Sequence, residues 1–211
     1  MNERRAALPP DCEELFRRVR AGDREAFDLL RRHLLPPIER FAARLIGPGE
    51  DRTDIVREAM LALWVSRDRL AGPDSLLPFA YRVARNTAYD ILRARGRFDV
   101  LSGDSMRGEP FGERRMAPTP GPEETMIRLT LWQEVQEAMD RLPELQRQTM
   151  ILYAEEDFTY QQIAEAMATD IGTVRSRLFH ARRNLKRHLR PDTCVALGLN
   201  TENDRQSTAG K

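Results

Sequence analysis

The densest concentration of reactive side chains lies between residues 172 and 190. This stretch holds seven positive residues and no acidic residue. The positive residues are Arg175, Arg177, Arg182, Arg183, Lys186, Arg187 and Arg190. Guanidinium groups form paired hydrogen bonds with guanine edges and phosphates, and ammonium groups act as point charges for phosphates. The segment therefore predicts binding to a polyanion, with DNA favoured by the pattern around it.

The apolar residues of the same segment have the spacing of a helix. They recur at steps of four, three, four and four, which places them on one inward face. They are Val174, Leu178, Ala181, Leu185 and Leu189. The opposite face then points outward and offers hydrogen-bonding, cationic and aromatic groups to base edges in a major groove. The candidate base-contacting residues are Thr173, Arg175, Ser176, Phe179, His180 and Arg183.

A second helix precedes the basic one. Thr159 and Gln162 have the spacing of a capping box at its start, and Asp170 is placed to cap the basic helix. Only a tight turn separates the two helices, so the pair predicts a helix-turn-helix whose basic second helix enters the major groove. Arg147 is an isolated positive residue in the acidic segment upstream, and we expect it to contact a phosphate.

Helical spacing of apolar residues extends through most of the chain, and the alternation typical of strands is absent. Asp11 with Glu14 predicts a capping box, Gly22 a helix end, and Asp23 the cap of the next helix. Pro36 and Pro37 predict a break or kink in that helix. A further long helix is expected from Ser75 to about Arg95, and the fold class is therefore all-α.

The periodicity divides the chain into two small helical domains. We expect the first domain at residues 11–97 and the second, which contains the helix-turn-helix, at residues 125–190. Residues 98–124 collect Gly, Pro, Ser and Met, which predicts a flexible linker. Residues 191–211 are mostly small and polar, which predicts a disordered tail.

Composition narrows the possible functions. The net charge is only +1, so attraction to nucleic acid must come from local clustering of basic residues. Cys12 and Cys194 stand far apart, and the three histidines have no neighbouring cysteine, so we expect no metal site and no cofactor. No apolar run reaches the length of a membrane helix, and the N-terminus lacks the pattern of a signal peptide. We therefore expect a cytoplasmic protein with no membrane insertion.

Several motifs of the second domain resemble the promoter-recognition domain of bacterial extracytoplasmic-function sigma factors of RNA polymerase. These motifs lie at residues 142–144, 159–164 and 172–178, followed by Ala181 and Arg182. In this sequence Ala168 and Thr169 stand where the family usually has a glycine and an aliphatic residue. The resemblance implies that the second domain reads the upstream promoter element.

The first domain resembles the other conserved domain of that family. Residues 54–58 with Leu63 and Trp64 resemble its polymerase-binding helix, and residues 81–90 resemble its promoter-melting helix. The resemblance implies that Asp54 and Glu58 contact the RNA polymerase core. It also implies an anti-sigma partner. Finally, the resemblance assigns promoter DNA melting to one helix face, because the cations, the amide and the aromatic ring on that face suit binding of separated single strands. That face carries Arg82, Arg85, Asn86 and Tyr89.

Two alternatives remain open at this stage. A stand-alone regulator could use the same helix-turn-helix, with residues 11–97 as a sensor or dimerisation module, and would bind its operator without polymerase. A recombinase-like enzyme with an appended helix-turn-helix is the other alternative. Against an enzyme, the sequence has no phosphate-cradling glycine loop and no metal-binding or nucleophilic constellation.

Overall fold

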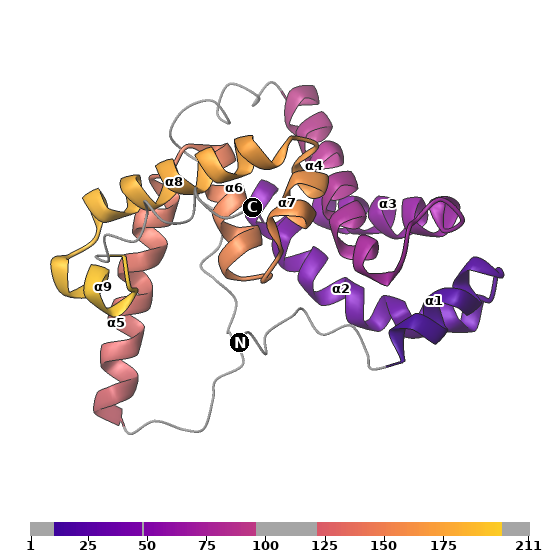
Figure 1. Ribbon diagram of the computed structural model, residues 1–211, viewed down its shortest axis with the longest axis horizontal. Helices are drawn as coiled ribbons and strands as arrows, with labels where there is room; N and C mark the ends of the chain where they lie inside the picture. Colours follow the sequence, from indigo (N-terminus) through magenta and orange to yellow (C-terminus); the bar gives the residue numbers. More distant parts are fainter. Residues whose placement is uncertain (1–10, 48, 96–121, 200–211) are drawn as a thin grey trace.

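The computed structural model describes residues 11–47, 49–95 and 122–199, and all regular elements in these ranges are helical, which confirms the all-α prediction. The first half contains α1 (Cys12–Arg20), α2 (Arg24–Ile46), α3 (Glu50–Ser66), a 3-10 turn (Pro73–Ser75) and α4 (Leu76–Ala94). The second half contains α5 (Pro122–Asp140), α6 (Glu144–Ala154), α7 (Tyr160–Met167), α8 (Ile171–His188) and α9 (Pro191–Ala196). Figure 1 shows their arrangement.

Local signals set the start of the first half. Gly22 has a φ of 88°, a left-handed conformation that lets the chain turn after α1. The Asp23 carboxylate then caps α2 by accepting hydrogen bonds from the backbone N–H groups of Glu25 and Ala26 at 2.9 and 3.1 Å. The predicted capping box at the start of α1 is wrong. Asp11 makes no side-chain cap there, and the Glu14 carboxylate instead pairs with Arg17, one turn later, at 2.7 Å.

The α2 helix runs without interruption through Pro36 and Pro37, so the break predicted there is not present. Leu34 and Ile38 flank the prolines and are both fully buried, so packing on either side holds the segment helical. The hydroxyl of Tyr81 in α4 lies 3.2 Å from the carbonyl oxygen of Pro37. Tertiary contacts thus outweigh the two backbone hydrogen bonds that the proline nitrogens cannot form.

The second half is built around α8, which packs against α6 and α7. All of the apolar residues predicted to face inward from this helix are buried, because their spacing aligns them along one stripe. Both predicted caps of the helix-turn-helix are also present, at Thr159 and at Asp170. The sequence therefore predicted this motif correctly.

The chain after α8 differs from the sequence prediction. Residues 191–199 were expected to belong to a disordered tail, but they include α9, in which Thr193 and Cys194 are buried. The Glu134 carboxylate of α5 anchors this segment by accepting hydrogen bonds from Arg190 Nε at 2.9 Å and from the Thr193 hydroxyl at 2.7 Å. Residues 200–211 and predicted linker residues 98–121 lie outside the described ranges, and residues 122–124 begin α5.

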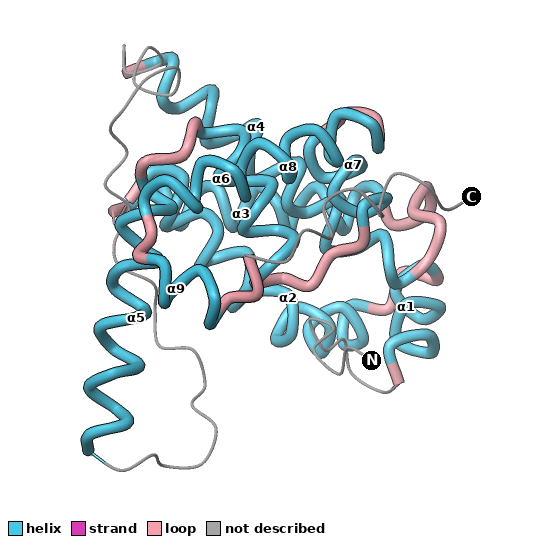
Figure 2. The backbone as a smooth tube through the Cα atoms, turned by 60° about the vertical axis from the view of Figure 1, so that its left-hand side comes forward, coloured by secondary structure: helices cyan, strands magenta, loops and turns pink. Residues whose placement is uncertain are grey.

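The two halves pack directly against each other, with α7 of the second half lying on α4 of the first. The buried side chains of both halves form a single hydrophobic cluster. At its centre the ring of Tyr81 lies 4.5 Å from that of Phe41 and 5.3 Å from that of Phe158, measured between centroids. Figure 2 shows the same neighbourhood, with α4, α6, α7 and α8 gathered together.

Candidate nucleic-acid interface

The turn between α7 and α8 fixes the angle of the candidate recognition helix. Thr159 and Gln162 form a reciprocal capping box at the start of α7, and Ala168 ends that helix in a left-handed conformation with a φ of 50°. Asp170 then begins α8, where its carboxylate accepts hydrogen bonds from the backbone N–H and the hydroxyl of Thr173 at 2.8 and 2.6 Å. The Thr173 hydroxyl bond, followed by the backbone bond, holds the pKa of Asp170 below its ordinary value.

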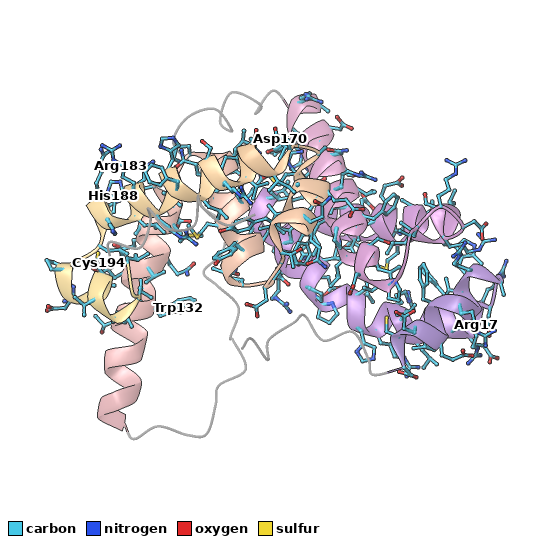
Figure 3. The ribbon with its side chains drawn as sticks, viewed as in Figure 1. Arg17, Trp132, Asp170, Arg183, His188 and Cys194 are labelled. Atoms are coloured by element: carbon cyan, nitrogen blue, oxygen red, sulfur yellow. The ribbon has the colours of Figure 1, made fainter. Side chains whose placement is uncertain are left out.

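The outward face of α8 is accessible along its length, as the sequence predicts. Its exposed members are Arg175, Ser176, Phe179, His180 and Arg183, while Thr173 is partly exposed. Phe179 is 44% exposed, so part of its ring is accessible on this face. In Figure 3 the labelled Arg183 projects away from the bundle, and Asp170 marks the opposite end of the same helix.

Arg147 does not belong to this exposed surface. It is 7% exposed, and its guanidinium forms ion pairs with Glu144 and, at 3.6 Å, with Asp140. The expectation of a phosphate contact at Arg147 is therefore corrected, because its charge is already neutralised inside the second half. The acidic residues around it, which made it conspicuous in the sequence, are the groups that hold it.

On α4 the predicted melting face is only partly open. Asn86 is exposed, whereas Arg82, Arg85 and Tyr89 are partly buried. The Arg85 guanidinium lies over the Tyr89 ring, 4.6 Å from its centroid, and Arg82 lies over the Phe79 ring at 5.2 Å. Cation–π contacts of this kind hold both arginines on the helix surface.

Side chains of the second half contact this melting face. Arg85 Nε donates a hydrogen bond to Gln148 Oε1 at 3.1 Å, and the Tyr89 hydroxyl lies 3.0 Å from Gln148 Nε2. Sequence reasoning missed Gln148 because its partners Arg85 and Tyr89 lie 63 and 59 residues earlier in the chain, so no local pattern points to them. Partial burial, and after it the positive charge of Arg85, lower the pKa of Arg177 in α8 from its ordinary value.

The predicted polymerase contacts lie on α3. Asp54 and Glu58 are both exposed, and Asp54 pairs with Arg57 at 2.8 Å. The same helix face carries two residues that the sequence analysis did not single out, Leu61 and Val65, which are 55% and 67% exposed. Their positions at helical spacing from Glu58, outside the buried stripe of α3, could have revealed them. Two carboxylates followed by two exposed aliphatic side chains form a surface suited to another protein.

Within the described residues, no helix is long and apolar enough to cross a membrane, and no group of three or more His, Cys, Asp and Glu side chains could hold a metal ion.

The geometry thus defines a helical protein with a DNA-binding helix-turn-helix in its second half. Family comparison agrees with this class: residues 30–98 match the family described as Sigma-70 region 2, and residues 132–185 match Sigma-70, region 4. The RNA polymerase sigma-H factor of Pseudomonas aeruginosa is 32% identical over 183 residues, which cover 85% of this chain and 94% of that protein. The ECF RNA polymerase sigma-E factor of Escherichia coli K12 is 32% identical over 179 residues, which cover 84% and 93%.

The chain belongs to the extracytoplasmic-function, or ECF, sigma factors of RNA polymerase. Two solved structures share its fold. CnrH in complex with the cytosolic domain of CnrY has a TM-score of 0.56 at 18% identity, covering 90% of this chain and 99% of that one. The sigma factor RpoE in complex with the anti-sigma factor NepR, from Bartonella quintana, has a TM-score of 0.56 at 23% identity, covering 77% and 96%.

Proposed function

We propose that this chain binds the RNA polymerase core and directs it to promoters by reading two DNA elements. The single observation that carries the proposal is the exposed basic face of α8, displayed by a capped helix-turn-helix in a chain of the sigma family. The bond-forming chemistry of transcription belongs to the polymerase, and the role proposed here is recognition and strand separation.

Each part of the proposal is assigned to one helix. The outward side chains of α8 meet base edges in the upstream promoter element, with Arg175 and Arg183 as guanine-reading candidates. The face of α4 that includes Arg85 and Asn86 captures bases released during melting. The α3 surface made of Asp54, Glu58, Leu61 and Val65 binds the polymerase core, with the aliphatic pair adding apolar contact to the carboxylates.

An anti-sigma partner is also part of the proposal. Family membership supports it, and one protein of the same fold, the sigma factor RpoE of Bartonella quintana, was solved in complex with the anti-sigma factor NepR. Such a partner would act by covering the α3 and α8 surfaces, which are the exposed surfaces that the active protein needs.

Run-off transcription with purified core polymerase on genomic DNA fragments tests this function. We expect specific transcripts only when the full chain and core are both present. A chain that bound its DNA site tightly without core, and added no transcripts with it, would instead be a stand-alone regulator. The Asp54→Ala and Leu61→Ala variants should weaken core association, whereas Glu13→Ala, an exposed acidic site on α1, should not.

A further inference from the structure

The C-terminal end of the candidate recognition helix is held by a side chain from another helix. Glu134 of α5 accepts hydrogen bonds from the backbone N–H of Arg190 at 2.5 Å, from Arg190 Nε at 2.9 Å and from the Thr193 hydroxyl at 2.7 Å. Arg190 lies two residues after α8, and Thr193 lies in α9. One carboxylate therefore ties the exit of α8 and the start of α9 to α5, and Figures 1 and 2 both show α9 beside α5.

The bonds to Glu134 differ from an ordinary surface ion pair. The Glu134 side chain is 16% exposed, although that of Arg190 is 65% exposed. The backbone N–H of Arg190, then the Thr193 hydroxyl, and after these the Arg190 guanidinium hold the pKa of Glu134 below its ordinary value. The carboxylate is therefore charged at neutral pH, and a charged acceptor strengthens each of these hydrogen bonds.

The α9 helix has little else to hold it in place. It has only six residues, too few for a helix to be stable by itself. Its buried residues are Thr193 and Cys194, whereas Val195 and Leu197 at its end are 64% and 43% exposed. Because apolar packing of α9 is so limited, the bond from Thr193 to Glu134 is a main anchor of this segment.

Both ends of the recognition helix are thus fixed in the same way. At its start the Asp170 carboxylate accepts hydrogen bonds from the backbone N–H and the hydroxyl of Thr173. At its end the Glu134 carboxylate accepts them from a backbone N–H and a threonine hydroxyl. The 18 residues of α8 span about 27 Å at a rise of about 1.5 Å per residue, so a small rotation displaces its side chains considerably. Hydrogen bonds to base edges need donor–acceptor distances of about 2.7–3.2 Å and are lost on such a displacement.

We propose that Glu134 is a positioning residue for reading the upstream promoter element, because its carboxylate fixes the C-terminal end of α8 through Arg190 and Thr193. In this role Glu134 acts through α8 and not by contacting DNA. The match to Sigma-70, region 4 covers residues 132–185, so it includes Glu134 but ends before both of its partners. The proposal rests on the proposed function, since it concerns the same DNA-reading helix.

Binding of the holoenzyme to two DNA fragments tests this role. The first is a promoter fragment that yields a run-off transcript with the wild-type chain and core polymerase, and the second is the same fragment with its upstream element scrambled. The quantity measured is the dissociation constant for the scrambled fragment divided by that for the intact one. We expect Glu134→Ala and Thr193→Val to lower this ratio about three- to tenfold, the range that corresponds to one or two hydrogen bonds. The loss should come from weaker binding to the intact fragment, since phosphate contacts to either fragment are kept.

Two control variants separate positioning from folding. Thr193→Ser keeps the hydroxyl and should keep the wild-type ratio, whereas Thr193→Val replaces the hydroxyl by a methyl group. Glu137→Ala removes an exposed carboxylate about one turn further along α5 and should change neither dissociation constant. A variant that only folded less well would give fewer active molecules, but those molecules would show the wild-type ratio.

The two threonine variants decide the test even if Glu134→Ala does not fold. An unchanged ratio in Thr193→Val, or an equal loss in Thr193→Ser and Thr193→Val, would overturn the proposal, as would an unchanged ratio in a folded Glu134→Ala. Failure of the proposed function would look different. A wild-type chain that yields no transcript, or that binds both fragments equally, would reject reading of the upstream element itself.

Discussion

Ala168 occupies a backbone conformation that favours glycine. Its φ of 50° ends α7, and its side chain is exposed, so no packing requires the methyl group. In this region the Cβ atom of an L-residue costs about 1–2 kcal/mol of strain in the folded state. Glycine removes this strain, but it also makes the unfolded chain more flexible, which cancels part of the gain in stability. The turn of the helix-turn-helix therefore carries strain that one substitution can remove.

We expect Ala168→Gly to raise the free energy of unfolding by about 0.5–1 kcal/mol, measured by urea denaturation. The matched control is Ala21→Gly, because Ala21 also follows a helix and is exposed but has a φ of −73°. At position 21 the glycine substitution should lower the free energy of unfolding. Equal effects at the two positions would show that the turn is not strained.

Glu156 carries the second prediction at this scale. Its side chain is 5% exposed, and burial raises its pKa from 4.5, while Arg40, a Tyr81 hydrogen bond and Arg44 oppose the rise and Asp157 adds to it. A raised carboxyl pKa means that the folded state retains the proton longer than the unfolded state. The contribution of protonated Glu156 to the free energy of unfolding is complete below the pKa of this carboxyl group in the unfolded state. It is lost as pH rises through the higher pKa of the folded state.

The wild-type free energy of unfolding should therefore include a decline with rising pH above about 4.5 that Glu156→Gln lacks. The amide keeps an acceptor for Tyr81 without a charge to desolvate. Chemical denaturation at a series of pH values measures both curves. Parallel curves for the two proteins would mean that the Glu156 carboxyl group has the same pKa in the folded and unfolded states.

For individual helices, α8 leads to a prediction about specificity. Arg175 and Arg183 are exposed on its outward face, so the double variant Arg175→Ala with Arg183→Ala should lose about 1–3 kcal/mol of binding per base contact and discriminate less between upstream sequences. Arg187→Ala, near the end of the helix, should instead weaken all sequences alike through a lost phosphate contact. Promoter binding by the holoenzyme, measured on DNA with single base changes, separates these results. Uniform weakening in both variants would remove the base-reading assignment.

The helices differ in how far the sequence could predict them. The outward face of α8 and its caps were predicted because periodicity and capping depend on residues a few positions apart. The order in α9 could not be predicted, because Thr193 and Cys194, although buried, form no apolar stripe. Their segment is instead anchored by Glu134, which lies 56 residues before Arg190. The uninterrupted α2 was also missed, because burial on both sides of Pro36 and Pro37 is a tertiary effect.

At the level of the whole molecule, the sequence predicts two tethered domains, and the structure joins them through a shared core. The joining residues are ordinary in the sequence: Phe158 follows three acidic residues, and Gln148 lies between Arg147 and Thr149. Contacts such as Tyr81 with Phe158 depend on long-range packing, which leaves no periodic mark. The role of Asp54 and Glu58 in polymerase binding was inferred from resemblance alone and stays a prediction. Leu61 and Val65 lie at helical spacing from Glu58, and the structure adds that both are exposed.

The proposed function assigns strand opening to the first half and upstream recognition to the second. Permanganate footprinting, which detects unstacked thymines, tests this division most directly when applied to promoter DNA with core polymerase. We expect reactive thymines with the wild-type chain and with Arg31→Ala, an exposed control on α2, but not with Arg85→Ala combined with Asn86→Ala, although that variant still binds core. Open DNA in the double variant, or no opening with the wild-type chain, would contradict the account.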